Sequence, residues 1–216
     1  IWDFKTGECL NSLEGHSSYV YSIAISPDGK YIVSGSDDET IKIWDFKTGE
    51  CLNSLEGHSS YVYSIAISPD GKYIVSGSDD ETIKIWDFKT GECLNSLEGH
   101  SSYVYSIAIS PDGKYIVSGS DDETIKIWDF KTAECLNSLN GHSMSVYSIA
   151  ISPDGKYIVS GSGDETIKIW DFKTGECLNS LEGHSSYVYS IAISPDGKYI
   201  VSGSDDETIK IWDFKT

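Results

Sequence analysis

Residues 15–45 read GHSSYVYSIAISPDGKYIVSGSDDETIKIWD, and nearly the same string returns every 42 residues along the chain. The 216 residues therefore divide into five units and a partial repeat: 1–42, 43–84, 85–126, 127–168, 169–210 and 211–216. A fixed period of this length predicts an array of one repeated supersecondary unit. We treat residues 1–216 as a single array of such units.

Each unit contains four short runs with strand character: 20–26, 30–36, 40–46 and 50–56 in the first full copy. They are rich in β-branched and aromatic residues, and turn sequences such as Ser-Pro-Asp-Gly separate them. No run has a helical period. One four-stranded sheet cannot bury both of its faces, so the pattern predicts that the units stack as an all-β array that closes into a ring.

The pair Gly15-His16, the SPDG turn at 26–29 and the string SGSDDETIKIWD at 34–45 resemble the WD40 repeat. The resemblance covers the whole chain. It implies a WD40-type β-propeller of five 42-residue, four-stranded blade units, with VYSIAIS as the innermost strand of each blade. ECLNSLE of the following unit then supplies the outermost strand, and strand exchange ("velcro") closes the ring.

Each unit also holds a histidine, a serine, an aspartate and a tryptophan at a constant phase. A Ser-His-Asp set is the signature of a hydrolase, but five copies of one active site are implausible. The resemblance instead implies a structural hydrogen-bonded tetrad, and Ser36 competes with Ser34 for the hydroxyl position. The tetrads comprise His16, Ser34, Asp38, Trp44; His58, Ser76, Asp80, Trp86; His100, Ser118, Asp122, Trp128; His142, Ser160, Asp164, Trp170; and His184, Ser202, Asp206, Trp212.

The unit at 127–168 differs from the others at five positions, and four of them fall in loops expected at one end of the ring. That end is the predicted binding rim, although drift of exposed loops explains the edits equally well. Tyrosines and carboxylates recur there. The candidate rim residues are Tyr19, Tyr21, Asp37, Tyr61, Asp79, Tyr103, Asp121, Asn140, Met144, Ser145, Gly163, Tyr187 and Asp205; the fifth edit, Ala133, belongs to the other end.

Thirty-four acidic residues stand against sixteen lysines and no arginine, a formal net charge of −18. Such a chain is a poor partner for nucleic acid or an anionic membrane. No motif predicts a metal site, a cofactor or an enzyme. We therefore expect a non-catalytic scaffold or sensor propeller with a protein or peptide partner, its rim suited to a cationic or lysine-rich peptide.

The alternative is an engineered structural protein with no ligand of its own. The near-identity of four units resembles recently amplified WD40 arrays of bacteria, cyanobacteria especially, where they form sensor regions of signalling NTPases. No GxxxxGK[ST] motif of an NTPase is present. The resemblance therefore implies an excised or engineered segment.

The five cysteines recur at one phase of the repeat and form no CxxC pattern. We interpret them as small core residues of a protein in a reducing, cytoplasmic compartment.

For the assembly we expect a homodimer that closes a ten-bladed ring, because ten blades need a wedge angle nearer to that of the usual seven-bladed ring than five do. A five-bladed monomer is the alternative. Residues 1–4 repeat the sequence of 211–214 and are expected to be displaced or frayed.

Overall fold

The computed structural model describes residues 1–214 and places nineteen strands in five antiparallel sheets, which we call blades 1 to 5. Blades 1 to 4 have four strands each, and blade 5 has three. Blade 1 consists of β1 (Val20–Ile25), β2 (Tyr31–Ser36), β3 (Ile41–Asp45) and β4 (Cys51–Leu55); blade 2 of β5 (Val62–Ile67), β6 (Tyr73–Ser78), β7 (Ile83–Asp87) and β8 (Cys93–Leu97). Blade 3 consists of β9 (Val104–Ile109), β10 (Tyr115–Ser120), β11 (Ile125–Asp129) and β12 (Cys135–Leu139). Blade 4 consists of β13 (Val146–Ile151), β14 (Tyr157–Ser162), β15 (Ile167–Asp171) and β16 (Cys177–Leu181), and blade 5 of β17 (Val188–Ile193), β18 (Tyr199–Ser204) and β19 (Ile209–Asp213).

The predicted all-β propeller architecture is confirmed, and the strands lie within a residue or two of their predicted limits. Within a blade, consecutive strands pair in sequence order, so each of the first four sheets takes its outermost strand from the next sequence unit. The Ser26-Pro27-Asp28-Gly29 turn joins β1 to β2 as expected. Gly29 has a φ of 70°, a left-handed conformation that glycine adopts without a Cβ clash.

Consecutive blades pack face to face through their apolar side chains. Val33 and Ile41 of blade 1 lie against Val62, Ile65 and Trp86 of blade 2, and the same cluster recurs at the next three boundaries. The fold is therefore held by four repeated interfaces between blades.

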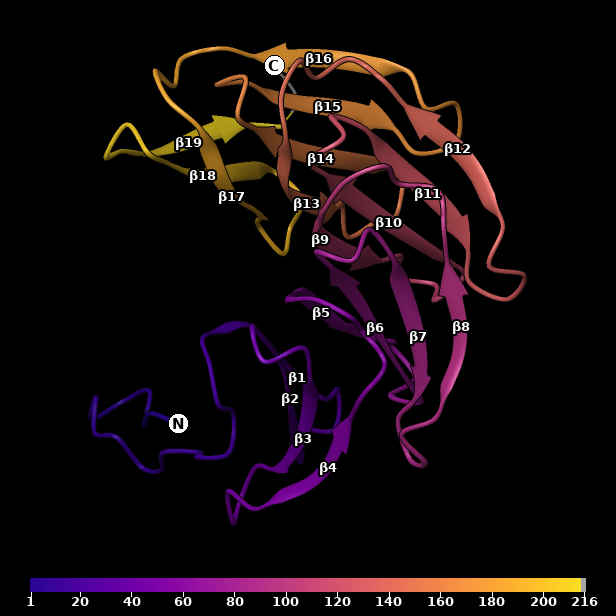
Figure 1. The fold of residues 1–216 in the computed structure, drawn as a ribbon. Coiled ribbons are helices and arrows are strands. Elements are labelled where there is room, and N and C mark those ends of the chain that lie inside the picture. The colour runs from indigo at the N-terminus through magenta and orange to yellow at the C-terminus, as the bar shows by residue number, and fades with distance from the viewer. Residues whose placement is uncertain (215–216) are drawn as a thin grey trace.

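The innermost strands β1, β5, β9, β13 and β17 each pack on the next one along the chain, but no comparable packing joins β17 back to β1 within residues 1–214. Figure 1 shows the result as an open arc, with blade 1 at one end and the yellow blade 5 at the other. Ring closure is not seen in this single chain.

The cysteine prediction is wrong: all five free thiols are exposed, at Cys9, Cys51, Cys93, Cys135 and Cys177. Four of them begin the outermost strands β4, β8, β12 and β16. These strands form the outer edge of each blade, where a strand pairs with another strand on one side only. One apolar residue per unit was not enough to predict a core position.

The amino-terminal residues agree with expectation in one respect and differ in another. Residues 1–4 do not take the strand position of 211–214 in blade 5, as predicted, but they are not frayed: Trp2 forms a bridge with Cys9, and the Asp3 N–H donates to Glu8 O at 2.8 Å. Trp212 takes its own place in β19, paired with Ile200 of β18. The two copies of IWDF therefore occupy two different strand positions in the chain.

Candidate functional site

Each blade contains a buried chain of hydrogen bonds that links three of its elements. In blade 2, His58 Nδ1 lies 2.7 Å from Asp80 Oδ2 and His58 Nε2 lies 2.7 Å from Ser76 Oγ. The Trp86 indole N–H donates to the same Ser76 Oγ at 2.9 Å. With the ring proton on Nδ1, the imidazole donates to the carboxylate, and Nε2 accepts the hydrogen bond from the serine O–H. Every polar atom in this series of hydrogen bonds therefore has a partner.

The structure brings all five predicted sets together with the same connectivity. The corresponding bonds join His16, Asp38, Ser34 and Trp44; His100, Asp122, Ser118 and Trp128; His142, Asp164, Ser160 and Trp170; and His184, Asp206, Ser202 and Trp212. Ser34, not Ser36, contacts the indole, whereas Ser36 Oγ accepts the Asp38 N–H at 3.1 Å.

A threonine that the sequence analysis did not single out extends each tetrad. Thr82 Oγ1 donates to Asp80 Oδ1 at 2.6 Å, and the Ser59 N–H donates to Oδ2 at 3.0 Å. Burial by itself raises the pKa of Asp80, but the hydrogen bonds from His58, Thr82 and Ser59 outweigh it and hold the pKa well below its ordinary value. The carboxylate is thus ionised at neutral pH.

This geometry does not suit catalysis. Ser76 and its counterparts Ser118 and Ser160 are completely buried, and each hydroxyl is already occupied by an indole and an imidazole. A nucleophilic serine must contact its substrate. The arrangement instead joins the loop that carries the histidine to two strands of the blade.

The candidate rim is built around a row of tyrosines whose neighbouring rings contact each other at a tilt. Tyr21, Tyr63, Tyr105, Tyr147 and Tyr189 come from the five innermost strands, and neighbouring ring centroids are separated by 5.1, 5.2, 5.2 and 4.9 Å. Of the five tyrosines in this row, only Tyr21 is among the candidate rim residues named from the sequence. The other four have the same place in their units and could have been found from the repeat alone.

A second set of tyrosines flanks this row. Tyr61 lies 6.5 Å from Tyr21 and 6.2 Å from Tyr63, and Tyr103 and Tyr187 have equivalent positions. Tyr19, at the open end of the arc, is 75% exposed. These rings present apolar and hydroxyl surface at one end of the blades.

A carboxylate accompanies each unedited rim position. Asp79 Oδ2 accepts the Ser60 O–H at 2.6 Å, and Oδ1 accepts the Tyr63 O–H at 3.3 Å. Burial first, and then the charge of Asp79, raise the pKa of Tyr63 well above its usual range, so the phenol stays neutral. Asp37, Asp121 and Asp205 occupy the same place in blades 1, 3 and 5 and accept the hydroxyls of Ser18, Ser102 and Ser186, respectively.

Three of the edits in blade 4 lie together, since the Gly163 N–H donates to Ser145 O at 2.9 Å and Gly163 lies beside Met144. A Cβ added to Gly163 would lie 3.3 Å from Met144 Cβ and from the Tyr147 ring, so the edited positions 163 and 144 are direct neighbours. Ser145 replaces a flanking tyrosine, and its hydroxyl donates to Asp121 of blade 3 at 2.6 Å. Asn140 lies in the same β12–β13 loop, where its side chain donates to Ser138 O at 3.2 Å. Blade 4 thus interrupts the acidic, tyrosine-rich rim.

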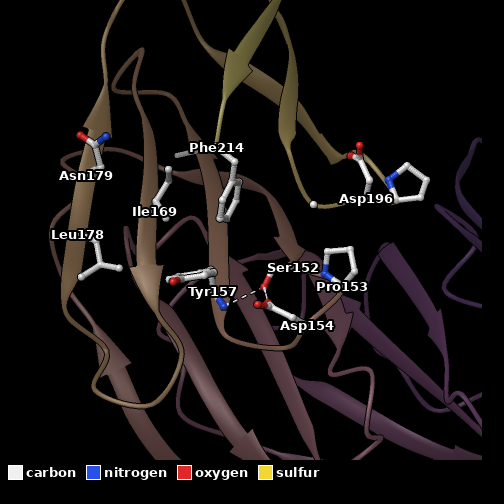
Figure 2. Close-up of a pocket in the computed structure, with 11 residues that line it drawn as sticks. Ser152, Pro153, Asp154, Tyr157, Ile169, Leu178, Asn179, Asp196 and Phe214 are labelled. Atoms are coloured by element: carbon white, nitrogen blue, oxygen red, sulfur yellow. Dashed lines mark hydrogen bonds between the residues drawn. The ribbon is translucent and has the colours of Figure 1, made fainter. Parts of the chain in front are cut away.

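A hollow of about 770 Å³ lies at the boundary of blades 4 and 5, away from the rim. Figure 2 shows it between Tyr157 and Ile169 of blade 4 and Phe214, with the Tyr157 N–H bonded to Ser152 Oγ at 3.0 Å. A smaller hollow of about 190 Å³ lies at the equivalent place between blades 3 and 4. The larger volume occurs beside the blade that has three strands.

Within residues 1–214, no group of three or more His, Cys, Asp or Glu side chains is placed to hold a metal ion. The described part of the chain also has no helix long and apolar enough to cross a membrane.

Comparison with known proteins gives five matches to the sequence profile of one family, WD40, described as "WD domain, G-beta repeat". The matched stretches are residues 7–45, 49–87, 91–129, 133–171 and 175–213, which together cover most of the chain.

Single stretches of the chain also resemble longer fungal proteins. One is 44% identical over 43 residues to the nuclear distribution protein PAC1 of Arthroderma benhamiae, which is 20% of this chain and 9% of that protein. Another is 48% identical over 42 residues to the nuclear distribution protein nudF 2 of Penicillium rubens (19% and 9%). A third is 60% identical over 35 residues to the vegetative incompatibility protein HET-E-1 of Podospora anserina (16% and 3%). The chain thus matches less than a tenth of the length of each relative.

Proposed function

The chain belongs to the WD40 family, and from that membership we propose that it is a non-catalytic scaffold or sensor propeller that binds a protein or peptide. The observation that carries the proposal is the rim, where exposed tyrosines and carboxylates recur in consecutive blades. Aromatic side chains offer large contact area at a small entropic cost. The five tetrads serve, in this proposal, as structural links that hold each blade in shape.

The ligand class follows from the charge of the rim. Asp37 and Asp79 lie beside tyrosine rings, and the chain as a whole carries −18. A carboxylate attracts an ammonium group, and the face of a tyrosine ring attracts the same cation. We therefore propose a cationic or lysine-rich peptide as the partner, bound across the rim.

A direct binding measurement tests this proposal. A fluorescent lysine-rich peptide should bind the wild-type chain, and a glutamate-rich peptide of the same length should not. Alanine at Tyr19, Tyr61, Tyr103 and Tyr187 together should abolish binding. Alanine at Leu94 and Leu136, exposed on the outermost strands, is the matched control and should leave the affinity unchanged. Equal affinity of the tyrosine variant and the wild type would contradict the proposal.

The second candidate, favoured by the near-identity of four units, is an engineered structural protein with no ligand of its own. It predicts that neither peptide binds. In either case we place the protein in the cytoplasm, because five exposed free thiols suit a reducing compartment.

We also propose a second copy of this chain as a partner, forming a homodimer that closes a ten-bladed ring. The open arc supports this, because its two end blades lack the neighbours that the inner blades have. Sedimentation equilibrium should give a mass twice the 23.8 kDa of one chain. A mass of one chain would instead support the five-bladed monomer.

A further inference from the structure

The two ends of the arc expose the two halves of an interface that the chain already forms four times inside itself. We call the face of a blade that packs on the following blade its downstream face, and the face that packs on the preceding blade its upstream face. At each internal boundary, one downstream face covers one upstream face. Between blades 1 and 2, Ile41 on the downstream face and Val62 on the upstream face are completely buried, and Ile65 is 7% exposed.

The same residues are open at the ends. On the upstream face of blade 1, Val20 and Ile23 are 50% and 68% exposed, and on the downstream face of blade 5, Ile209 and Ile211 are 76% and 71% exposed. A cavity of about 580 Å³ lies on the blade 1 face, lined by Ile23 among others. Soluble proteins rarely leave contiguous apolar faces of this kind uncovered.

A glycine in each of blades 1 to 4 lies in close contact with the following blade. A Cβ added to Gly119 would lie 2.8 Å from Val146 Cγ1 and 2.9 Å from Ile149 Cγ1 of the following blade, so the contact requires glycine. Gly203 is the equivalent residue in blade 5. A Cβ there would meet only Ser190 Cβ of its own blade, at 3.9 Å, so no other blade occupies the space beside Gly203 in the described chain.

A hydrogen bond accompanies each internal contact. Ser22 Oγ accepts the Ile65 N–H at 3.0 Å, and the bond recurs at the next three boundaries. At the ends of the arc, the matching acceptor is Ser190 Oγ and the matching donor is the Ile23 N–H. These two atoms do not meet within one chain, because blades 1 and 5 lie apart.

The outermost strand position of blade 5 is also open, and a candidate strand lies at the other end of the arc. In blades 1 to 4 this strand pairs with the IWD sequence, as Cys51 does with Trp44. Residues 9–11 carry the same sequence as the start of β4. Residues 8–10 pair with Ile1, Trp2 and Asp3 in the same pattern. A two-stranded hairpin is marginally stable by itself, so a second IWDF strand can displace the first.

We propose that the downstream face of blade 5 binds the upstream face of blade 1 of a second copy. In this contact, Val20 and Ile23 pack against Gly203 in the way that Val146 and Ile149 pack against Gly119. In the same step, residues 8–11 leave Ile1–Phe4 of their own chain and pair with β19 of the other copy. Ile1–Phe4 therefore competes with β19 of the other copy for pairing with residues 8–11. This contact rests on the homodimer proposed above and describes its interface, but it does not depend on the peptide-binding rim.

The variant Gly203→Ala tests the contact without disturbing the fold, because its Cβ has room within the chain. We expect 10- to 100-fold weaker self-association, measured as a dissociation constant by sedimentation, since a comparable overpacked contact costs about 1–3 kcal/mol. Its circular dichroism and melting temperature at a concentration where both proteins are monomeric should equal those of the wild type. The exposed-face variant Ile23→Lys should weaken association in the same way.

Removal of residues 1–4 should have the opposite effect. Without the competing strand, we expect about tenfold tighter association, a gain of about 1.4 kcal/mol. A wild-type chain that stays monomeric at 100 μM, or a Gly203→Ala chain that associates as strongly as the wild type, would overturn the contact. An assembly of another size that Gly203→Ala dissolves would support the contact while contradicting the ten-bladed ring.

Discussion

Blades 1 and 2 have the same sequence in their innermost strands, yet the two strands lie in different surroundings. Val62 and Ile65 of β5 are buried against blade 1, whereas Val20 and Ile23 of β1 face outward. The backbone pairing within the two blades is identical. The difference arises entirely from the presence or absence of a blade on one side.

The tetrads show the same contrast more weakly. His58, His100, His142 and His184 are buried, but His16 of blade 1 is only partly so, although its bonds to Asp38 and Ser34 have the same lengths as elsewhere. Hydrogen bonding within a blade is therefore set by the repeat itself. Apolar burial is set by the neighbouring blade, and the comparison separates these two contributions to stability.

The largest effect is expected from removing an isoleucine inside the arc. Ile125→Ala, in the buried interface of blades 3 and 4, should lower the free energy of unfolding by about 2–5 kcal/mol, because it loses buried apolar surface and leaves a cavity. Ile209→Ala changes the equivalent residue at the open face of blade 5. Its effect should stay within about 0.5 kcal/mol.

Both isoleucine variants should be made in the Gly203→Ala background, so that association does not cover Ile209. Urea unfolding followed by tryptophan fluorescence gives the two free energies. Equal losses for the two variants would show that the interface between blades is not the source of the difference.

The tetrad comparison gives the second effect. Ser118→Ala leaves the buried Trp128 indole N–H and the Nε2 atom of His100 without a partner, which should cost about 1–3 kcal/mol. Ser202→Ala in blade 5 should cost less, because Trp212 is only partly buried and water can replace the lost hydroxyl. Urea unfolding measures both. Ser120→Ala removes the other buried serine hydroxyl of the same blade, which donates to Ser102 O and accepts the Asp122 N–H but does not contact the indole. A larger loss for Ser118→Ala therefore assigns the effect to the tetrad serine.

The sequence predicted the repeat, the strands and the tetrads because all three are local properties. The spacing of His58, Ser76 and Trp86 recurs in every unit, and bonds within one blade do not depend on which blades surround it. The resemblance to the WD40 repeat also predicted that the outermost strand comes from the following unit.

The sequence could not predict what depends on neighbours. Cys51 and Val62 are both small apolar residues in strands, but the first lies at the outer edge and the second beneath an adjacent blade. The contact between the Tyr63 and Tyr105 rings depends on the distance between neighbouring innermost strands, which the sequence of a single unit does not contain. Trp2 and Trp212 stand in identical IWDF sequences, so no local signal could predict that one pairs with Cys9 and the other with Ile200.

Acid sensitivity should follow the tetrad carboxylates. The pKa of Asp122 is lowered in the folded chain because hydrogen bonds from His100, Thr124 and Ser101 outweigh the effect of burial. Its stabilising contribution is therefore complete above the unfolded pKa of about 3.9 and is lost as the pH falls below that value. We expect the wild type to lose about 1 kcal/mol through this residue between pH 5 and pH 3.

Asp122→Asn should be less stable than the wild type at pH 6 but should lose less stability between pH 5 and pH 3. Asp206→Asn, in the open blade 5, should change the acid dependence less, because Thr208, which donates to its carboxylate, is exposed to water, whereas Thr124 is partly buried. Urea unfolding at five pH values separates the two. Parallel curves for Asp122→Asn and the wild type would mean that the acid loss arises elsewhere.

The smallest effect concerns the one edit outside the rim. Ala133 has a φ of 60°, where the equivalent Gly175 has 74°, and an alanine in the left-handed region is strained. Its methyl group packs on the interface of blades 2 and 3, which offsets part of that cost. We expect Ala133→Gly to raise the free energy of unfolding by about 0.5 kcal/mol.

The reverse change, Gly175→Ala, should lower stability by about 1 kcal/mol, since its Cβ would lie 2.3 Å from Asn137 Nδ2 and the asparagine must move. Gly49→Ala sits at the start of the arc and meets Asn11, which belongs to the amino-terminal hairpin rather than to a complete blade. That hairpin can shift more easily, so Gly49→Ala should cost less than Gly175→Ala in thermal unfolding. A larger loss for Gly49→Ala would mean that residues 1–11 are held as firmly as an inner blade, and strand exchange at this end of the arc would then be disfavoured.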